Sequence, residues 1–322
     1  MEKFLSCDWG TSRFRLRLVQ VADLRVLATI THGRGIVDTF NSWKAQKGQR
    51  SSRKAFYVNV LKEAVTELSQ KSGITLDGIP IVLSGMASAT VGLAELPYKM
   101  LPFRLDGTDL LIETMDAEGL EHRLILVSGV KTDRDVMRGE ETKVLGCASV
   151  LDGREEKQLL ILPGTHPKHI WVMGGQAMAF ETYMTGEFFE LLTRHSILSA
   201  SVTVGADVSD SMSRDYFREG VRTSQSFDLL HAAFMTRTNE VLRHVPKAAN
   251  FYYLSGVLIG AELRGISADV PICLVGGPKH NPLYEWALSE LGVPVAKTMD
   301  ADEALIKGQQ LIFSAQNFIN QL

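Results

Sequence analysis

Cysteine is scarce in this chain, and the paired spacing typical of metal-binding cysteines is missing. The 322 residues contain three cysteines, Cys7, Cys147 and Cys273, which lie far apart and form no CxxC pair. Each lies in or beside an apolar run. We therefore expect buried, reduced thiols rather than a disulfide framework or a zinc site.

Long apolar runs and a strong net charge are also missing. No apolar run approaches the ~20 residues that span a bilayer, and Met1-Glu2-Lys3 leads straight into a short strand without a visible signal peptide. The formal net charge is −3, which gives no indication of binding to nucleic acid or to an anionic membrane. These absences predict a cytoplasmic protein.

A GxGxxG turn that opens a strand–turn–helix unit is missing too, which argues against a nicotinamide-dependent dehydrogenase. What the chain does contain is one pattern that appears twice, over residues 4–18 and 159–172. Each copy reads as an apolar strand, a Gly-Thr turn (10–11 and 164–165) and a second strand, and a third strand-like run follows. A turn rich in N–H and hydroxyl groups can hold a phosphate. Two such turns across a cleft predict a nucleotide-dependent phosphotransferase built from a duplicated domain.

The rest of the chain alternates strands with helices. Apolar runs at 81–86 and 124–129 predict buried parallel strands, and the polar stretch Asp152–Lys157 predicts a boundary between lobes 1–153 and 154–322. The second half repeats the order, with three strands, several helices, and further strands at 272–277 and 293–297. This pattern predicts an α/β layered fold with mixed sheets.

Several blocks resemble one superfamily. Asp8-Trp9-Gly10-Thr11-Ser12 is similar to the first phosphate motif of the actin-like ATPases and sugar kinases, Gly164-Thr165-His166 to the second, and Leu274–Gly277 with Asn281-Pro282 to the adenosine motif. Within it the chain resembles the 2-dehydro-3-deoxygalactonokinases over almost its whole length, through the blocks Leu83–Met86, Asp135–Thr142, Pro163–His166, Met184–Glu187 and Ser255–Glu262.

The resemblance implies duplicated actin-like ATPase (ribonuclease H-like) domains with the nucleotide in the cleft between two lobes. It implies transfer of the ATP γ-phosphate to the 6-hydroxyl of 2-dehydro-3-deoxy-D-galactonate, in galactonate catabolism, with Mg²⁺. A kinase for the gluconate epimer and a phosphohydrolase of the same fold remain as alternatives. The expected partners are therefore a small sugar acid and ATP, and pairing into a homodimer stays open.

The same resemblance assigns residues to the nucleotide. Asp8 is expected to hold Mg²⁺ or its waters beside the γ-phosphate. Gly256 has two explanations, close helix packing or approach to adenosine. The remaining nucleotide residues expected are Gly10, Thr11, Ser12, Gly164, Thr165, His166, Lys168, Gly276 and Gly277.

The acceptor side centres on the segment Asp135–Thr142. One of Glu140 and Glu141 is expected to take the proton of the attacking hydroxyl, and the residues alone do not say which. Arg138 is expected to bind the substrate carboxylate, or instead to pair with Asp133 or Asp135. The turn Ser84, Gly85, Met86 and Ala87 is expected to contact the acceptor. The chain departs from the family pattern at Pro167, His169 and Pro278.

Overall fold

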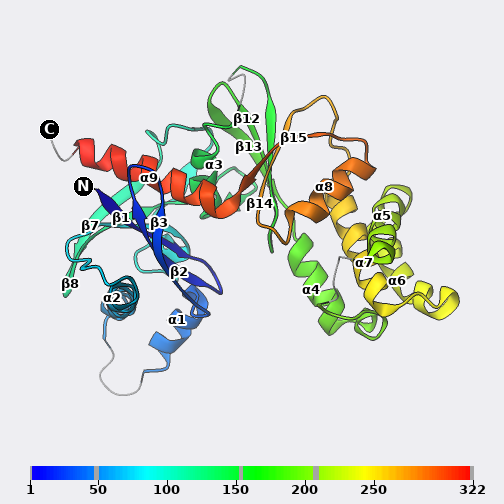
Figure 1. Cartoon of the computed structure of the whole chain (residues 1–322), viewed down its shortest axis with the longest axis horizontal. Helices are drawn as coiled ribbons and strands as arrows, with labels where there is room; N and C mark the ends of the chain where they lie inside the picture. The colour runs from blue at the N-terminus through cyan, green and yellow to red at the C-terminus, as the bar shows by residue number, and fades with distance from the viewer. Residues whose placement is uncertain (1, 47–50, 152–154, 206–209, 320–322) are drawn as a thin grey trace. The chain divides into compact units, whose positions relative to one another are not determined.

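The computed structural model describes residues 2–46, 51–151, 155–205 and 210–319 (Figure 1). By packing, the chain divides into two compact units. The first comprises Met1–Glu155, Met173–Ala179 and Asp302–Leu322, and the second comprises Glu156–Val172 and Phe180–Ala301. Each unit is described by itself below.

The division into lobes at residue 153 stays a prediction. As packing units, residues 173–179 and 302–322 group with the first unit, although the predicted division puts both segments in the second lobe. The expected boundary residues 152–154 lie outside the described residues.

The first unit is built on a mixed sheet of order β3-β2-β1-β4-β8-β7. Its strands are β1 (Lys3–Trp9), β2 (Phe14–Gln20), β3 (Val26–His32), β4 (Ile81–Gly85), β7 (Ile112–Ala117) and β8 (Leu120–Val127). β1 pairs with β2 antiparallel and with β4 parallel, and β4 pairs with β8 parallel. The buried parallel strands expected around 81 and 124 are thus confirmed.

Helices and short strands complete this unit. Helix α2 begins after Ser52, whose side chain accepts from the Ala55 N–H, and ends at Gly73 in the left-handed region, as capping rules predict. It buries Tyr57, Leu61 and Leu68 against the sheet. The other elements are α1 (Ile36–Lys44), α2 (Arg53–Ser72), α3 (Glu140–Gly146), α9 (Ala301–Ile319), η1 (Met86–Ser88), β5 (Lys99–Met100), β6 (Phe103–Arg104), β9 (Val130–Lys131) and β10 (Val136–Met137).

The second sheet has the order β15-β14-β11-β12-β13-β6. Its strands besides β6 are β11 (Gln158–Leu162), β12 (Lys168–Met173), β13 (Gln176–Thr182), β14 (Ile272–Gly276) and β15 (Val295–Asp300). The helices of the second unit are α4 (Thr185–His195), η2 (Ile197–Ser201), α5 (Ser211–Ser226), α6 (Leu229–Arg243), α7 (Lys247–Glu262) and α8 (Asn281–Glu290).

The two sheets share one topology. Numbered within each copy, five strands follow the order third, second, first, fourth, fifth: β3-β2-β1-β4-β8 and β13-β12-β11-β14-β15. In both copies the first two strands are antiparallel, and the first, fourth and fifth are parallel. The predicted duplication and the α/β class with mixed sheets are therefore confirmed.

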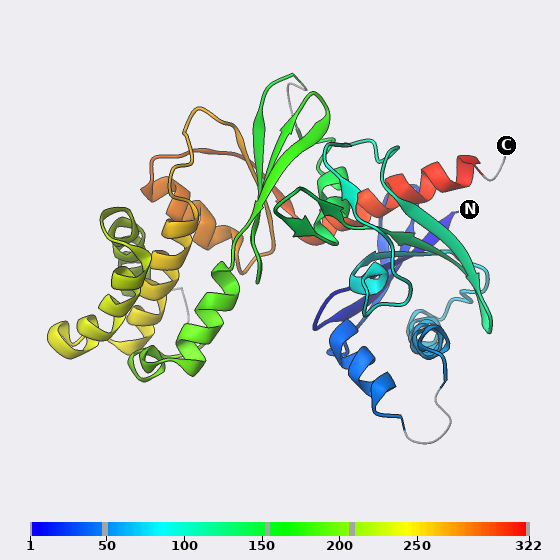
Figure 2. The ribbon, with the colours of Figure 1, turned by 180° about the vertical axis from the view of Figure 1, so that it is seen from behind.

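Helices α5 and α7 lie side by side in the second unit (Figure 2). Glycines allow this close approach: a Cβ on Gly220 would lie 2.1 Å from the Tyr253 carbonyl oxygen, and one on Gly256 would lie 2.0 Å from the Phe217 carbonyl oxygen. Among the described residues, no helix is both long enough and apolar enough to cross a bilayer.

Candidate active site

The first phosphate turn, Gly10–Ser12, joins β1 to β2. The Gly10 N–H donates to the Arg13 carbonyl at 2.9 Å, so it stabilises the turn itself. Thr11 and Ser12 are exposed, and within the described parts of the chain nothing accepts a hydrogen bond from their backbone N–H groups. These two N–H groups can therefore donate to a phosphate.

Gly35, which the sequence analysis missed, supports this turn from behind. A Cβ on Gly35 would lie 2.2 Å from the Thr11 carbonyl oxygen and 2.4 Å from the Ser12 Cα. The next N–H, that of Ile36 at the start of α1, donates to the Gly10 carbonyl at 2.9 Å. Backbone thus packs directly on backbone, so a side chain at position 35 would displace the turn.

The second turn, Gly164–His166, repeats this construction. A Cβ on Gly186 would lie 2.4 Å from the Gly164 carbonyl oxygen and 2.7 Å from the Thr165 Cα. The Glu187 N–H at the start of α4 donates to the Thr165 carbonyl at 3.1 Å. The signal that could have revealed both supports is a glycine at the start of the first helix after the third strand, 25 residues beyond Gly10 and 22 beyond Gly164.

The turn glycines themselves have no packing reason to be glycine. A Cβ on Gly10 would lie 3.5 Å from the Arg13 carbonyl oxygen, an ordinary contact, and a Cβ on Gly164 would meet no atom of the described residues within 4 Å. Neither residue has a positive φ. Glycine thus leaves open space in front of each turn, and this space allows a ligand to approach the backbone closely.

Charged side chains surround the second turn. His166 Nε2 lies 2.5 Å from Glu187 Oε2, and both side chains are about half exposed. Lys168 is 4% exposed and donates from Nζ to the His166 carbonyl at 2.9 Å. Its cation therefore lies beneath the turn, where it favours an anion above.

His169, one of the departures from the family pattern, belongs to a buried cluster. Its Nε2 lies 3.0 Å from Glu262 Oε1, and the other carboxylate oxygen of Glu262 accepts from the Tyr284 hydroxyl at 2.7 Å. Burial and the adjacent Glu262 carboxylate hold the pKa of Tyr284 well above its usual range. This cluster joins β12 to α7 and α8, which gives His169 a structural explanation.

Three segments of the first unit meet at Gly85, at the end of β4. A Cβ on Gly85 would lie 2.8 Å from the Trp9 carbonyl oxygen and 3.6 Å from Asp8 Oδ1. A Cβ on Gly139 would in turn lie 3.1 Å from the Gly85 Cα. The Asp8 carboxylate and the first turn of α3 are therefore neighbours, although about 130 residues separate them in the sequence.

The two glutamates of α3 differ sharply in environment. Glu141 is fully buried, its Oε2 accepting from the Gly139 N–H at 2.6 Å and its Oε1 from the Thr142 hydroxyl at 3.2 Å. Burial, reinforced by the charge of Glu140, raises the pKa of Glu141 to about 8. Glu140 is half-buried, and its Oε2 accepts from the Arg138 N–H at 3.1 Å. Of the two, only Glu140 is open to a substrate.

Arg138 lies close to Glu140, and its side-chain hydrogen bonds among the described residues go to Ser88 and Leu96, so the alternative pairing with Asp133 or Asp135 is not seen there. Its Nη1 donates to the Ser88 carbonyl at 2.7 Å and to the Ser88 hydroxyl at 2.5 Å. The guanidinium stacks 4.1 Å from the Tyr98 ring centroid, and its buried Nε has no hydrogen-bond partner. A half-buried cation that has no counter-ion among the described residues suits an anionic ligand.

The predicted acceptor turn 84–87 is largely internal. Ser84 and Ala87 are buried, and the Ala87 carbonyl accepts from the N–H groups of Leu93 and Ala94. Met86 is the half-exposed member of the turn. Acceptor contacts by Ser84 and Ala87 stay a prediction that this burial does not favour.

The predicted adenosine motif ends β14. Asn281 Nδ2 donates to the Gly276 carbonyl at 3.1 Å, and a Cβ on Gly277 would meet nothing within 4 Å, so the backbone there is open. Pro278 is exposed beside it. Gly256, by contrast, is covered by α5, so helix packing accounts for this glycine, and its contact with the nucleotide stays a prediction.

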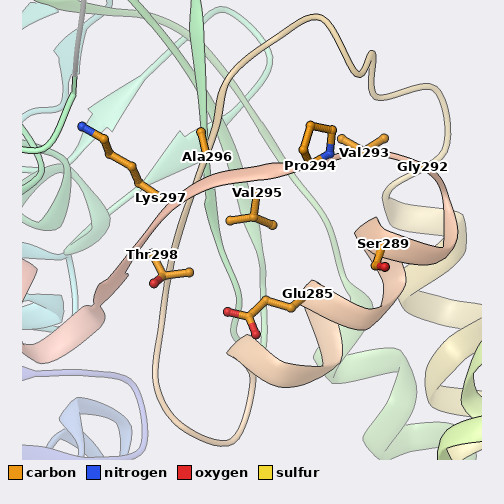
Figure 3. Close-up of a pocket in the computed structure, with 9 residues that line it drawn as sticks. All are labelled: Glu285, Ser289, Gly292, Val293, Pro294, Val295, Ala296, Lys297 and Thr298. Atoms are coloured by element: carbon orange, nitrogen blue, oxygen red, sulfur yellow. The ribbon is translucent and has the colours of Figure 1, made fainter.

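A separate pocket lies between α8 and β15 (Figure 3). Lys297 extends away from α8 there, whereas Glu285 and Ser289 belong to that helix. Its nine lining residues, Glu285, Ser289 and 292–298, include none of the predicted site residues.

Mg²⁺ is commonly held by one or two carboxylates together with substrate phosphates. Asp8 is half-exposed at the end of β1 and fits that pattern. Among the described residues no three metal-ligating side chains form a group, and Mg²⁺ binding by Asp8 stays a prediction.

Comparison with known proteins assigns the family. The model of the 2-keto-3-deoxy-galactonokinase family matches residues 8–312. The chain belongs to this family. A probable 2-dehydro-3-deoxygalactonokinase of Rhizobium meliloti (strain 1021) is 31% identical over 314 residues, 95% of this chain and 94% of the relative. The 2-dehydro-3-deoxygalactonokinase of Escherichia coli (strain K12) is 26% identical, covering 91% of each chain.

A solved structure shares the fold of this family member. The crystal structure of a putative 2-dehydro-3-deoxygalactonokinase from Sinorhizobium meliloti matches with a TM-score of 0.80 and 29% identity, over 97% of this chain and 96% of that one. The family resemblance predicted from the motifs is therefore confirmed, while the roles of individual residues stay predictions.

Proposed function

We propose that this protein is an ATP-dependent sugar-acid kinase that phosphorylates the 6-hydroxyl of 2-dehydro-3-deoxy-D-galactonate. Family membership supports the substrate class, because the relatives that the chain matches over more than nine-tenths of its length carry that name. The observation that carries the chemistry is the meeting of Asp8, Gly85 and the Glu140 end of α3. A metal-binding carboxylate and a proton acceptor are what phosphoryl transfer to an alcohol requires.

On the nucleotide side, the N–H groups of Thr11 and Ser12 would donate to phosphate oxygens. Thr165 and His166 would do the same in the second unit, above the Lys168 cation. The open backbone at Gly277 suits an adenine ring lying against it. Mg²⁺, held through Asp8 and the phosphates, would neutralise charge on the transferred group.

Glu140 is proposed as the proton acceptor. As the 6-oxygen of the acceptor forms its bond to the γ-phosphorus, the bond from that phosphorus to the bridging oxygen breaks, and ADP leaves. The proton of the 6-hydroxyl passes to the Glu140 carboxylate. Glu141 is a poor candidate, because a fully buried group cannot touch the hydroxyl and a pKa of about 8 keeps it protonated at neutral pH.

Arg138 is proposed to bind the carboxylate at the other end of the acceptor. Its guanidinium is already positioned by Ser88 and Tyr98, so little side-chain freedom is lost when the substrate binds. A carboxylate would also supply the counter-ion that the described residues lack.

A coupled assay of ADP release with Mg²⁺ tests this proposal. It compares 2-dehydro-3-deoxy-D-galactonate, its gluconate epimer and no acceptor at equal ATP. ADP release that depends on the galactonate acid supports the proposal. Release that depends on the gluconate acid assigns the other epimer, and equal release without any acceptor indicates a phosphohydrolase.

A further inference from the structure

A chain of hydrogen bonds runs from α9 through β4 into the first turn of α3. Gln309 Nε2 lies 3.0 Å from the Ser84 hydroxyl, which lies 3.1 Å from the Thr142 hydroxyl, which lies 3.2 Å from Glu141 Oε1. The far oxygen of Glu141 then accepts from the Gly139 N–H at 2.6 Å. All four side chains are buried, so the chain is shielded from water.

Backbone contacts hold α9 against this chain. A Cβ on Gly308 would lie 1.8 Å from the Thr142 carbonyl oxygen, and one on Gly146 would lie 1.8 Å from the Ala304 carbonyl oxygen. Gln309 Nε2 also lies 3.0 Å from the Cys7 carbonyl, one residue before Asp8. The network therefore reaches both strand β1, which carries Asp8, and the segment that precedes Glu140.

We infer that Glu141, Thr142, Ser84 and Gln309 form a positioning network that fixes Glu140 beside Asp8, with Glu141 acting as a neutral acid rather than as the base. This inference rests on the proposed function, because it concerns the group that receives the acceptor proton. Glu141 is thus a positioning residue, because its Oε2 accepts a hydrogen bond from the N–H of Gly139, the residue directly before Glu140.

The hydrogen-bond distances suit both protonation states of Glu141, because a hydroxyl can donate or accept, and burial beside Glu140 is what favours the neutral form. The Thr142 hydroxyl donates to Oε1 and the Gly139 N–H donates to Oε2; once Glu141 carries a proton, Oε1 can donate to the Thr142 hydroxyl instead, and Thr142 then donates to Ser84. An ionised Glu141 can only accept. It would also place a second buried negative charge next to Glu140.

Several other groups surround this position. On α3 the charge of Glu140 acts directly on Glu141, and β1 reaches the network through the Cys7 carbonyl, which accepts from Gln309. Strand β4 and helix α9 present Ser84 and Gln309, which do not titrate. Burial and the charge of Asp8 hold the pKa of Cys7 well above its usual range, so Cys7 adds no charge near neutral pH.

The test compares Glu141→Gln with Glu140→Gln in the galactonate-dependent assay from pH 6 to pH 9.5. Gln mimics the neutral acid, since its amide donates to Thr142 while its oxygen accepts from Gly139. We expect Glu140→Gln to lower kcat about 10²–10⁴-fold, and Glu141→Gln to lower it far less. We also expect kcat of the natural protein to fall above about pH 8, and this fall to be absent in Glu141→Gln.

Thr142→Val interrupts the network, and Thr142→Ser restores its hydroxyl. We expect Thr142→Val to lower kcat while the KM for ATP stays unchanged, and Thr142→Ser to recover most of the loss. A loss in Glu141→Gln as large as in Glu140→Gln would overturn the inference, as would identical pH profiles of the natural protein and Glu141→Gln.

Amide hydrogen exchange separates this inference from the proposed function, because it needs no turnover. We expect the Gly139 amide to exchange faster in Glu141→Ala than in the natural protein, and at the natural rate in Glu141→Gln. Unchanged exchange in Glu141→Ala would refute the positioning role, even if the assay finds a different acceptor.

Discussion

Replacing Glu141 by Gln should stabilise the fold, and the gain should depend on pH. In the folded protein the pKa of Glu141 is raised from 4.5 to about 8, by burial first and by Glu140 second. An unfolded glutamate releases its proton near pH 4.5, whereas the folded protein keeps it until about pH 8. The unfolded state therefore binds fewer protons between these values, and the stability of the natural protein falls as pH rises through them.

The size of the effect follows from the width of that window. Between pH 4.5 and pH 8, each pH unit lowers the free energy of unfolding of the natural protein by about 1.4 kcal/mol. This loss is close to zero at pH 4, about 3 kcal/mol at pH 7, and constant above pH 8. Glu141→Gln has no proton to lose and escapes this penalty. Its free energy of unfolding should thus exceed that of the natural protein by up to about 3 kcal/mol at pH 7.

Urea unfolding at pH 4.5, 6, 7 and 8 measures this difference. Glu118→Gln is the matched control, because it removes the same charge from an exposed turn and should change stability little at any pH. A difference between Glu141→Gln and the natural protein that stays constant from pH 4.5 to pH 8 would refute the assignment of Glu141 as a buried neutral acid.

Three further predictions follow from the site. Arg138→Lys keeps the charge but loses the planar guanidinium, so we expect the KM for the sugar acid to rise about 10-fold while the KM for ATP stays unchanged. An equal rise in both KM values would contradict a contact between Arg138 and the substrate carboxylate. Gly10→Ala and Gly164→Ala have room for a methyl group, so their free energy of unfolding should stay within about 0.5 kcal/mol of that of the natural protein. Their affinity for ATP, measured by calorimetry, should fall. A loss of stability instead would show that the glycines serve packing. Gly35→Ala should destabilise the protein by about 1–3 kcal/mol, because its Cβ would lie 2.2 Å from the Thr11 carbonyl oxygen. The control Gly33→Ala, whose Cβ would meet nothing within 4 Å, should leave stability nearly unchanged. Equal melting temperatures of the two variants would count against the close packing at Gly35.

The elements that the sequence predicts well are those whose signal is local. The strands on either side of Gly10 and Gly164 alternate with turns over a few residues, and the repeat of that pattern predicts the duplication. Helix α2 is marked by its own apolar spacing and caps. Strand β7 and helix α1 were not predicted, because β7 is an edge strand with mostly exposed residues and α1 has only two buried ones.

The parts of the site that were not predicted depend on contacts between distant residues. Gly35 supports a turn some 25 residues away, and Gln309 reaches Ser84 across 225 residues. Choosing between Glu140 and Glu141 requires burial, which two adjacent identical residues at a helix start cannot reveal. The contacts of Arg138 with Ser88 and Tyr98, in place of the alternative pairing with Asp133 or Asp135, likewise depend on long-range folding. The fold brings residue 138 back to the segment that follows β4.

The most direct test of the proposed kinase activity is to identify the phosphorylated product. The protein is incubated with ATP, Mg²⁺ and 2-dehydro-3-deoxy-D-galactonate, and the mixture is followed by phosphorus NMR with proton coupling. The account predicts a phosphate monoester split by the two protons of carbon 6, formed in step with ADP. Inorganic phosphate as the only new signal besides those of ADP, formed at a rate that does not depend on the sugar acid, would contradict it.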